Sequence, residues 1–124
     1  MWHSIDTVET LQTGEWCTEV QLPPESSWFP GHFPGDPILP GIAQLGMAYE
    51  AVCRALGERF RVAGFSRVKF KKIIRPGDCL KINVLQRKDL PGQYAFRIVA
   101  GDDVACSGTM ALEKRNDPAG LGGV

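Results

Sequence analysis

A segment rich in proline and glycine limits the fold of this chain more than any other feature. Residues 29–41 read FPGHFPGDPILPG and hold four prolines and three glycines. Proline lacks a backbone donor and clashes inside a helix, so this segment cannot form a helix or a central strand. Apolar side chains such as Phe33 and Leu39 are interleaved with these residues and would be costly to leave in water. We therefore expect an ordered loop.

The composition changes at Gly41, where an apolar segment without proline begins. Ala, Leu and Met are frequent in it and Gly57 follows its end, which predicts a helix over residues 41–56. Its clearly polar side chains before residue 54 are Gln44, Tyr49 and Glu50. A helix that is apolar on nearly every face is typically buried in the middle of a domain, and we expect that here.

Apolar and polar residues alternate with period two on both sides of this loop and helix, which predicts strands. The alternating segments are residues 15–22, 68–70, 80–84 and 94–98, with turns at 75–78, 90–92 and 101–103, and a last strand is expected at about residues 104–112. One helix on one face of an antiparallel sheet is an α+β arrangement. A single sheet around one helix leaves an edge and apolar area open. We therefore expect a homodimer, or a dimer-based oligomer, formed through sheet edges.

The length of 124 residues fits one domain, which we place at residues 1–113. The polar, glycine-rich tail 114–124 is expected to be flexible. Fourteen Lys and Arg balance fourteen Asp and Glu, so the basic excess typical of nucleic-acid binders is missing. No apolar run approaches the roughly 18 residues that span a bilayer. Residues 1–14 also lack the basic start and apolar stretch of a signal peptide.

The four cysteines form no CxxC pair and are spaced too widely for a zinc site. Since no secretion signal favours disulfides, we expect reduced, mostly buried thiols in a cytoplasmic protein. The four residues are Cys17, Cys53, Cys79 and Cys106.

Two segments resemble one enzyme family. Residues 32–41, HFPGDPILPG, closely resemble the signature of the hot-dog-fold 3-hydroxyacyl-[acyl-carrier-protein] dehydratases, and residues 68–80, VKFKKIIRPGDCL, are similar to a second block of that family. The resemblance covers roughly residues 15–112. It implies a hot-dog fold, in which a curled antiparallel sheet wraps one central helix, and this agrees with the predicted order of elements.

The resemblance also implies a reaction. His32 removes the C2 proton of a 3-hydroxyacyl thioester, and a helix carboxylate of the other subunit protonates the leaving hydroxyl, which leaves a trans-2-enoyl thioester. The backbone N–H of Gly41 holds the thioester carbonyl, and the acyl chain lies in an apolar tunnel at the dimer interface. The implied partner is acyl carrier protein with its phosphopantetheine-linked acyl chain. The chemistry is proton transfer alone, so we expect neither a metal nor an organic cofactor.

The residues themselves support much of this scheme. Imidazole has the side-chain pKa nearest neutrality, so His32 is suited to act as a base. The alternative is a structural loop histidine bonded to backbone. Gly41 is expected at a helix N-terminus, where N–H groups and the helix dipole stabilise a developing enolate oxygen and where glycine allows close approach. Phe33, Gln44 and Tyr49 are further candidates for substrate contacts.

The chain departs from the family at the acid. The family's carboxylate lies fourteen residues after the histidine, and that position here is Gly46. One turn later, Glu50 lies only about 40° around the helix axis, so it could serve as the acid if its pKa were raised by burial. The alternative is a surface ion pair with Arg54, four residues on. Tyr49 and Gln44 are weaker proton donors.

A local basic stripe is the last candidate feature. Arg67, Lys69 and Lys71 alternate, with Lys72 and Arg75 nearby, and they are predicted on the strand face opposite Phe70. Carrier proteins are acidic, so such a stripe would steer one toward the site. The alternative is an ordinary solvated sheet face.

Two other functions remain as hypotheses. Gly46 favours a catalytically impaired homologue that binds an acyl chain or serves as the partner subunit of an active dehydratase. A hot-dog thioesterase would need a carboxylate near the start of the helix to activate water, and the intact histidine motif argues against it.

Overall fold

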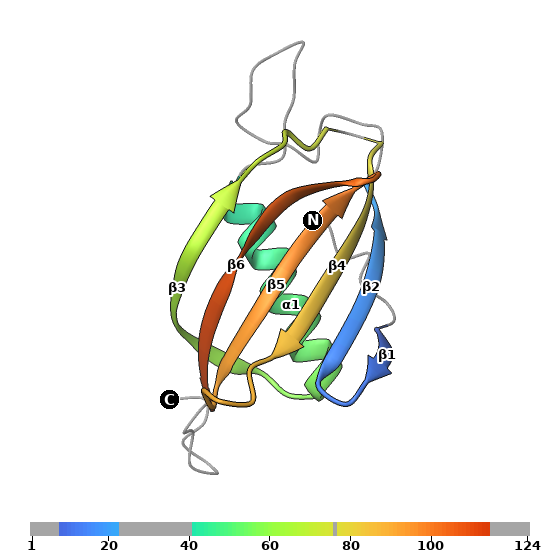
Figure 1. Cartoon of the computed structure of the whole chain (residues 1–124). Helices are drawn as coiled ribbons and strands as arrows, with labels where there is room; N and C mark the ends of the chain where they lie inside the picture. Colours follow the sequence, from blue (N-terminus) through green and yellow to red (C-terminus); the bar gives the residue numbers. More distant parts are fainter. Residues whose placement is uncertain (1–7, 23–40, 76, 115–124) are drawn as a thin grey trace.

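The computed structural model describes residues 8–22, 41–75 and 77–114, which form one helix against a single curled sheet (Figure 1). The helix α1 (Gly41–Leu56) lies on the inner face of six antiparallel strands. This confirms the predicted α+β hot-dog architecture. The rest of the Pro- and Gly-rich loop and residues 115–124 of the predicted tail lie outside the described residues.

The two edge strands of the sheet are far apart in the sequence. The strands are β1 (Glu9–Gln12), β2 (Glu15–Gln21), β3 (Phe60–Phe70), β4 (Cys79–Gln86), β5 (Gln93–Ala100) and β6 (Asp103–Lys114). Their order across the sheet is β1-β2-β4-β5-β6-β3. The chain therefore leaves α1, forms the far edge strand β3 beside β6, and returns to the middle of the sheet in β4.

The sequence predicted the positions of the inner strands better than those of the two edge strands, β1 and β3. Helix α1 has the predicted bounds, and the strands predicted at residues 15–22, 80–84, 94–98 and 104–112 correspond to β2, β4, β5 and β6. Strand β3 begins at Phe60, well before the predicted start at residue 68. Its first part was not predicted, because two register shifts interrupt the alternation of its side chains. Strand β1 was not predicted, since all four of its residues are exposed and no buried face imposes a pattern. Strand β6 runs through Lys114, the first residue of the predicted tail.

The core lies between α1 and the inner face of the sheet. Helix α1 packs on β4 and β5, whose inward residues alternate with exposed or half-buried ones. Burying these side chains supplies the main favourable free energy of the fold. The helix is not buried all round, however, because Ile42 is 77% exposed. The buried residues of these elements include Met47, Ala48, Ala51, Val52, Leu80, Ile82, Val84, Phe96 and Ile98.

A bulge in β3 determines how this edge strand packs on the core. The register with β6 shifts between Ser66 and Lys69, and Arg67 takes a positive φ of 55°. Val68 then packs over Gly108, where an added Cβ would lie 3.1 Å from Val68 Cγ2 and 2.9 Å from the ring of Phe96. A side chain at Gly108 would therefore force the ring of Phe96 or the side chain of Val68 to move.

The remaining compositional predictions have mixed outcomes. All four cysteines are free thiols, but only Cys53 and Cys106 are buried, Cys17 is half-buried, and Cys79 is exposed, so the expectation of mostly buried thiols is wrong for Cys79. Among the described residues, no helix is long and apolar enough to cross a membrane, and no group of three or more His, Cys, Asp or Glu is arranged to hold a metal ion.

Candidate functional site

Two predicted site residues, His32 and Phe33, lie outside the described residues. The described part of the candidate site consists of the N-terminus of α1, the end of β3 beside it, and the helix residues that follow (Figure 1). The other predicted site residues, Gly41, Gln44, Tyr49 and Glu50, all belong to α1.

Gly41 is the first residue of α1, as predicted. The first N–H groups of a helix have no intrahelical acceptor and carry the positive end of the helix dipole, which suits them to bind a carbonyl oxygen. A Cβ on Gly41 would lie only 2.8 Å from Phe70 Cζ and 3.1 Å from Phe70 Cε1. The tip of the Phe70 ring therefore occupies the space beside Gly41, and sequence analysis did not foresee this contact.

Gln44 and Gly46 differ in what they contribute to α1, and Gly46 occupies the position of the missing carboxylate. Gln44 is buried, with 4% of its surface exposed, which places a polar amide inside the core layer. Gly46 is half-buried and contributes no side chain. The helix thus offers an amide at Gln44, and Gly46 has no group that can transfer a proton.

Tyr49 is held in a structural contact. Its hydroxyl donates a hydrogen bond of 2.6 Å to the carbonyl oxygen of Phe60, at the start of β3. The guanidinium of Arg59 lies 5.3 Å from the centre of its ring, within the range of a cation–π contact. Burial, followed by the side chain of Cys53, raises the pKa of the Tyr49 hydroxyl. The Tyr49 proton is therefore directed toward backbone, and the residue ties α1 to β3.

Glu50 forms an ion pair, but with a different partner from the one predicted. Arg59 donates from Nη1 and Nη2 to the two carboxylate oxygens, at 2.9 and 3.1 Å. Glu50 is 30% exposed and Arg59 55% exposed. The hydrogen bonds to this carboxylate raise the pKa of Arg59. The prediction of Arg54 as the partner is wrong, because the chain turns back after α1 ends at Leu56 and brings Arg59, the residue before β3, to the carboxylate.

The position of Glu50 along the helix also matters for catalysis. It lies about 13 Å along the axis from Gly41, and about 6 Å beyond Gly46, at a rise of 1.5 Å per residue. A carboxylate engaged by a bidentate arginine acts as an acceptor only. The geometry therefore favours the structural alternative for Glu50 over the role of proton donor.

The predicted basic stripe is less regular than its sequence suggests. Arg67 belongs to the bulge and Lys71 follows the end of β3, so with Lys69 they do not alternate along one strand face. All three are exposed, and none makes an ion pair with another described residue. Lys72, in contrast, bonds to Asp103 at 3.1 Å.

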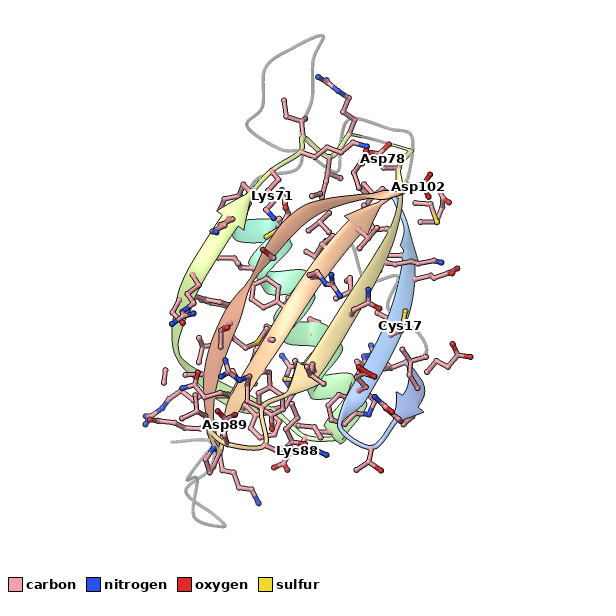
Figure 2. All side chains as sticks on the ribbon, in the orientation of Figure 1. Cys17, Lys71, Asp78, Lys88, Asp89 and Asp102 are labelled. Carbon is pink, nitrogen blue, oxygen red and sulfur yellow. The ribbon has the colours of Figure 1, made fainter. Side chains whose placement is uncertain are left out.

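The basic residues share their end of the sheet with acidic ones. In Figure 2, Lys71 lies where β3 ends, and Asp78 and Asp102 lie at the same end of the sheet. Figure 1 shows that α1 begins beside the end of β3, so Lys71 lies near the helix N-terminus. This end of the sheet therefore carries both signs of charge.

Comparison with known proteins identifies close similarities. A family model described as "ApeI-like: ApeI dehydratase" matches residues 8–109. The 3-hydroxyacyl-[acyl-carrier-protein] dehydratase FabZ of Haemophilus influenzae (strain PittEE) is 32% identical over 126 aligned residues, which cover 90% of this chain and 82% of that protein.

Solved structures agree with these matches. A chain of the dehydratase heterocomplex ApeI:P from Xenorhabdus doucetiae has a TM-score of 0.76 and 26% identity, covering 89% of this chain and 96% of its own. An uncharacterized protein from Pyrococcus horikoshii has a TM-score of 0.70 and 16% identity, covering 91% of this chain and 85% of its own. The second likeness concerns the fold alone.

Proposed function

Since the chain belongs to the ApeI-like dehydratase family, we propose that it dehydrates 3-hydroxyacyl thioesters on acyl carrier protein to trans-2-enoyl thioesters. The single observation that carries this proposal is the family match over residues 8–109, which includes the segment HFPGDPILPG. The products serve fatty acid biosynthesis or related acyl-chain biosynthesis.

In this mechanism the chain supplies a base and an oxyanion donor. His32 takes the C2 proton, and the electron pair left on C2 delocalises into the thioester carbonyl. The Gly41 N–H, at the positive end of α1, stabilises the enolate oxygen that forms. The C3 hydroxyl leaves as water when an acid protonates it, and the C2–C3 double bond forms. Every step is a proton transfer or an elimination, so no metal or organic cofactor takes part.

Two versions of this function differ in which residue protonates the leaving hydroxyl. In the first, the chain forms a homodimer and Glu50 supplies the proton. In the second, this chain is the partner subunit of a dehydratase whose other subunit supplies the carboxylate. The bidentate contact between Glu50 and Arg59, together with the glycine at position 46, favours the second version. The solved relative from Xenorhabdus doucetiae is described as a heterocomplex, which is compatible with it.

The open edge of β3 supports pairing with a second subunit in either version. Strand β3 is an edge of the sheet, and its Val62 and Phe70 are 39% and 52% exposed. Unpaired N–H and C=O groups at such an edge can add a strand from another chain. The exposed cations Lys69 and Lys71 near the start of α1 would steer an acidic carrier protein. The free cysteines suit the cytoplasm, where we place the reaction.

The test is an assay of the purified protein with 3-hydroxyacyl-carrier-protein substrates of several chain lengths, followed by mass spectrometry for loss of water. An active wild type that is silenced by His32→Ala, with its fold intact, supports the proposal. Retention of most of the rate in His32→Ala would contradict the role of the histidine.

The variant Gly46→Glu decides between the two versions. If the wild type is silent and Gly46→Glu turns over, the chain lacks only the acid and a partner supplies it in the active form. If neither the wild type nor Gly46→Glu dehydrates the substrates, the chain differs from active members of the family at more than this one residue. Sedimentation at micromolar concentration reports assembly, and a monomer across that range would contradict pairing through β3.

A further inference from the structure

The contact between Phe70 and Gly41 is unusual for a half-exposed aromatic side chain. Phe70 is 52% exposed, yet its ring tip lies so close to Gly41 that a Cβ there would be 2.8 Å from Cζ. Two further large apolar side chains near this contact in sequence, Ile42 and Ile73, are 77% and 52% exposed. The two segments that meet at this contact therefore carry exposed apolar side chains.

The backbone at Phe70 is held by strand β6. Phe70 is the last residue of β3 and pairs with Cys106 of β6. The next two N–H groups, of Lys71 and Lys72, both donate to the carbonyl of Ala105, at 2.8 and 3.3 Å. A strand end anchored in this way holds the ring against the helix, and only the side-chain torsions remain free to move it.

We propose that Phe70 is a positioning residue for the reaction, and that its ring orients the first turn of α1 and shields one side of the Gly41 amide from water. The proposal rests on the proposed function, in which the Gly41 N–H binds the thioester oxygen. An N–H donor stabilises an enolate most when its direction is set in advance and the surrounding dielectric is low. Phe70 acts through Gly41 and takes no part in proton transfer.

Two substitutions test the ring tip specifically. Phe70→Leu keeps an apolar side chain but does not reach the position of Cζ. Phe70→Tyr keeps the ring but adds an oxygen to Cζ, the ring atom closest to the Cβ position of Gly41. A residue that only covers apolar surface would accept tyrosine at 52% exposure. We therefore expect both variants to lower kcat by about tenfold or more, as displaced catalytic groups do, while KM changes by less than about twofold.

A matched control separates this effect from general loss of surface packing. Leu85 is 45% exposed and lies on β4, away from the start of α1. Leu85→Ala should leave kcat and KM unchanged. Circular dichroism and thermal unfolding confirm that all three variants fold. Wild-type kcat in folded Phe70→Leu and Phe70→Tyr would overturn the proposal and leave the proposed function intact.

A second measurement does not depend on turnover. In an amide-resolved hydrogen-exchange experiment on the same proteins, the Gly41 N–H should exchange faster in Phe70→Leu than in wild type, and its exchange rate should be unchanged in Leu85→Ala. An identical Gly41 exchange rate in wild type and Phe70→Leu overturns the proposal even if the purified chain is inactive. Faster exchange in Phe70→Leu when the wild type is inactive supports the positioning role and contradicts only the homodimeric form of the function.

Discussion

Removing the Glu50 carboxylate should affect stability slightly and turnover hardly at all. The change Glu50→Gln breaks the bidentate contact with Arg59, whose two hydrogen bonds measure 2.9 and 3.1 Å. Because the two side chains are 30% and 55% exposed, solvent screens their attraction. Exposed pairs contribute about 0.2–1 kcal/mol, and we expect a loss of no more than about 1 kcal/mol here. For a domain of this size, that lowers Tm by roughly 4 °C.

The matched variant is Arg59→Gln, which breaks the same ion pair and leaves the carboxyl group in place. If Glu50 is structural, the two variants should have similar Tm values, and both should keep the wild-type rate within about threefold, well below the loss of a general acid. Thermal unfolding and the carrier-protein dehydration assay measure both quantities.

The refuting result is a difference between the two variants. Loss of a general acid typically lowers the rate by about 10²–10⁴-fold. If Glu50→Gln loses that much and Arg59→Gln does not, Glu50 is the proton donor. The interpretation of the ion pair as a structural clamp would then be wrong.

Three further predictions concern stability. Gly108→Ala should lower the free energy of unfolding by about 1–3 kcal/mol, because its Cβ has no space, and adding Val68→Ala should recover part of the loss in a double-mutant cycle measured by urea unfolding. Burial raises the pKa of Cys106 from 9.0 to about 11, so the folded state disfavours the thiolate. The contribution of the Cys106 thiol to the free energy of unfolding is therefore complete below pH 9 and falls by about 2–3 kcal/mol between pH 9 and 11. In Cys106→Ala, the free energy of unfolding should decrease less steeply over this pH range. Tyr49→Phe removes the hydrogen bond to Phe60 and should cost about 0.5–1.5 kcal/mol in the same unfolding assay, whereas an unchanged midpoint would contradict a structural role for the hydroxyl.

The sequence determined the elements whose formation depends on nearby residues. The bounds of α1 follow from a segment that is apolar, free of proline, and ended by Gly57. The alternation in β2, β4 and β5 reflects one face that is more buried than the other, so it is visible without a structure. The prolines and glycines of residues 29–41 excluded a helix or a central strand there, and the resemblance of residues 32–41 to a known signature predicted the family.

Only the tertiary structure decided which distant residues meet. Spacing along a helix pointed from Glu50 to Arg54, but the turn that follows the helix brought in Arg59, nine residues away and just before β3. No local pattern could show that the ring of Phe70, twenty-nine residues after Gly41, fills the space beside it. The physical reason is that periodicity reports which face of an element is buried, whereas the register and order of strands set its neighbours, and these depend on the packing of the whole sheet around α1.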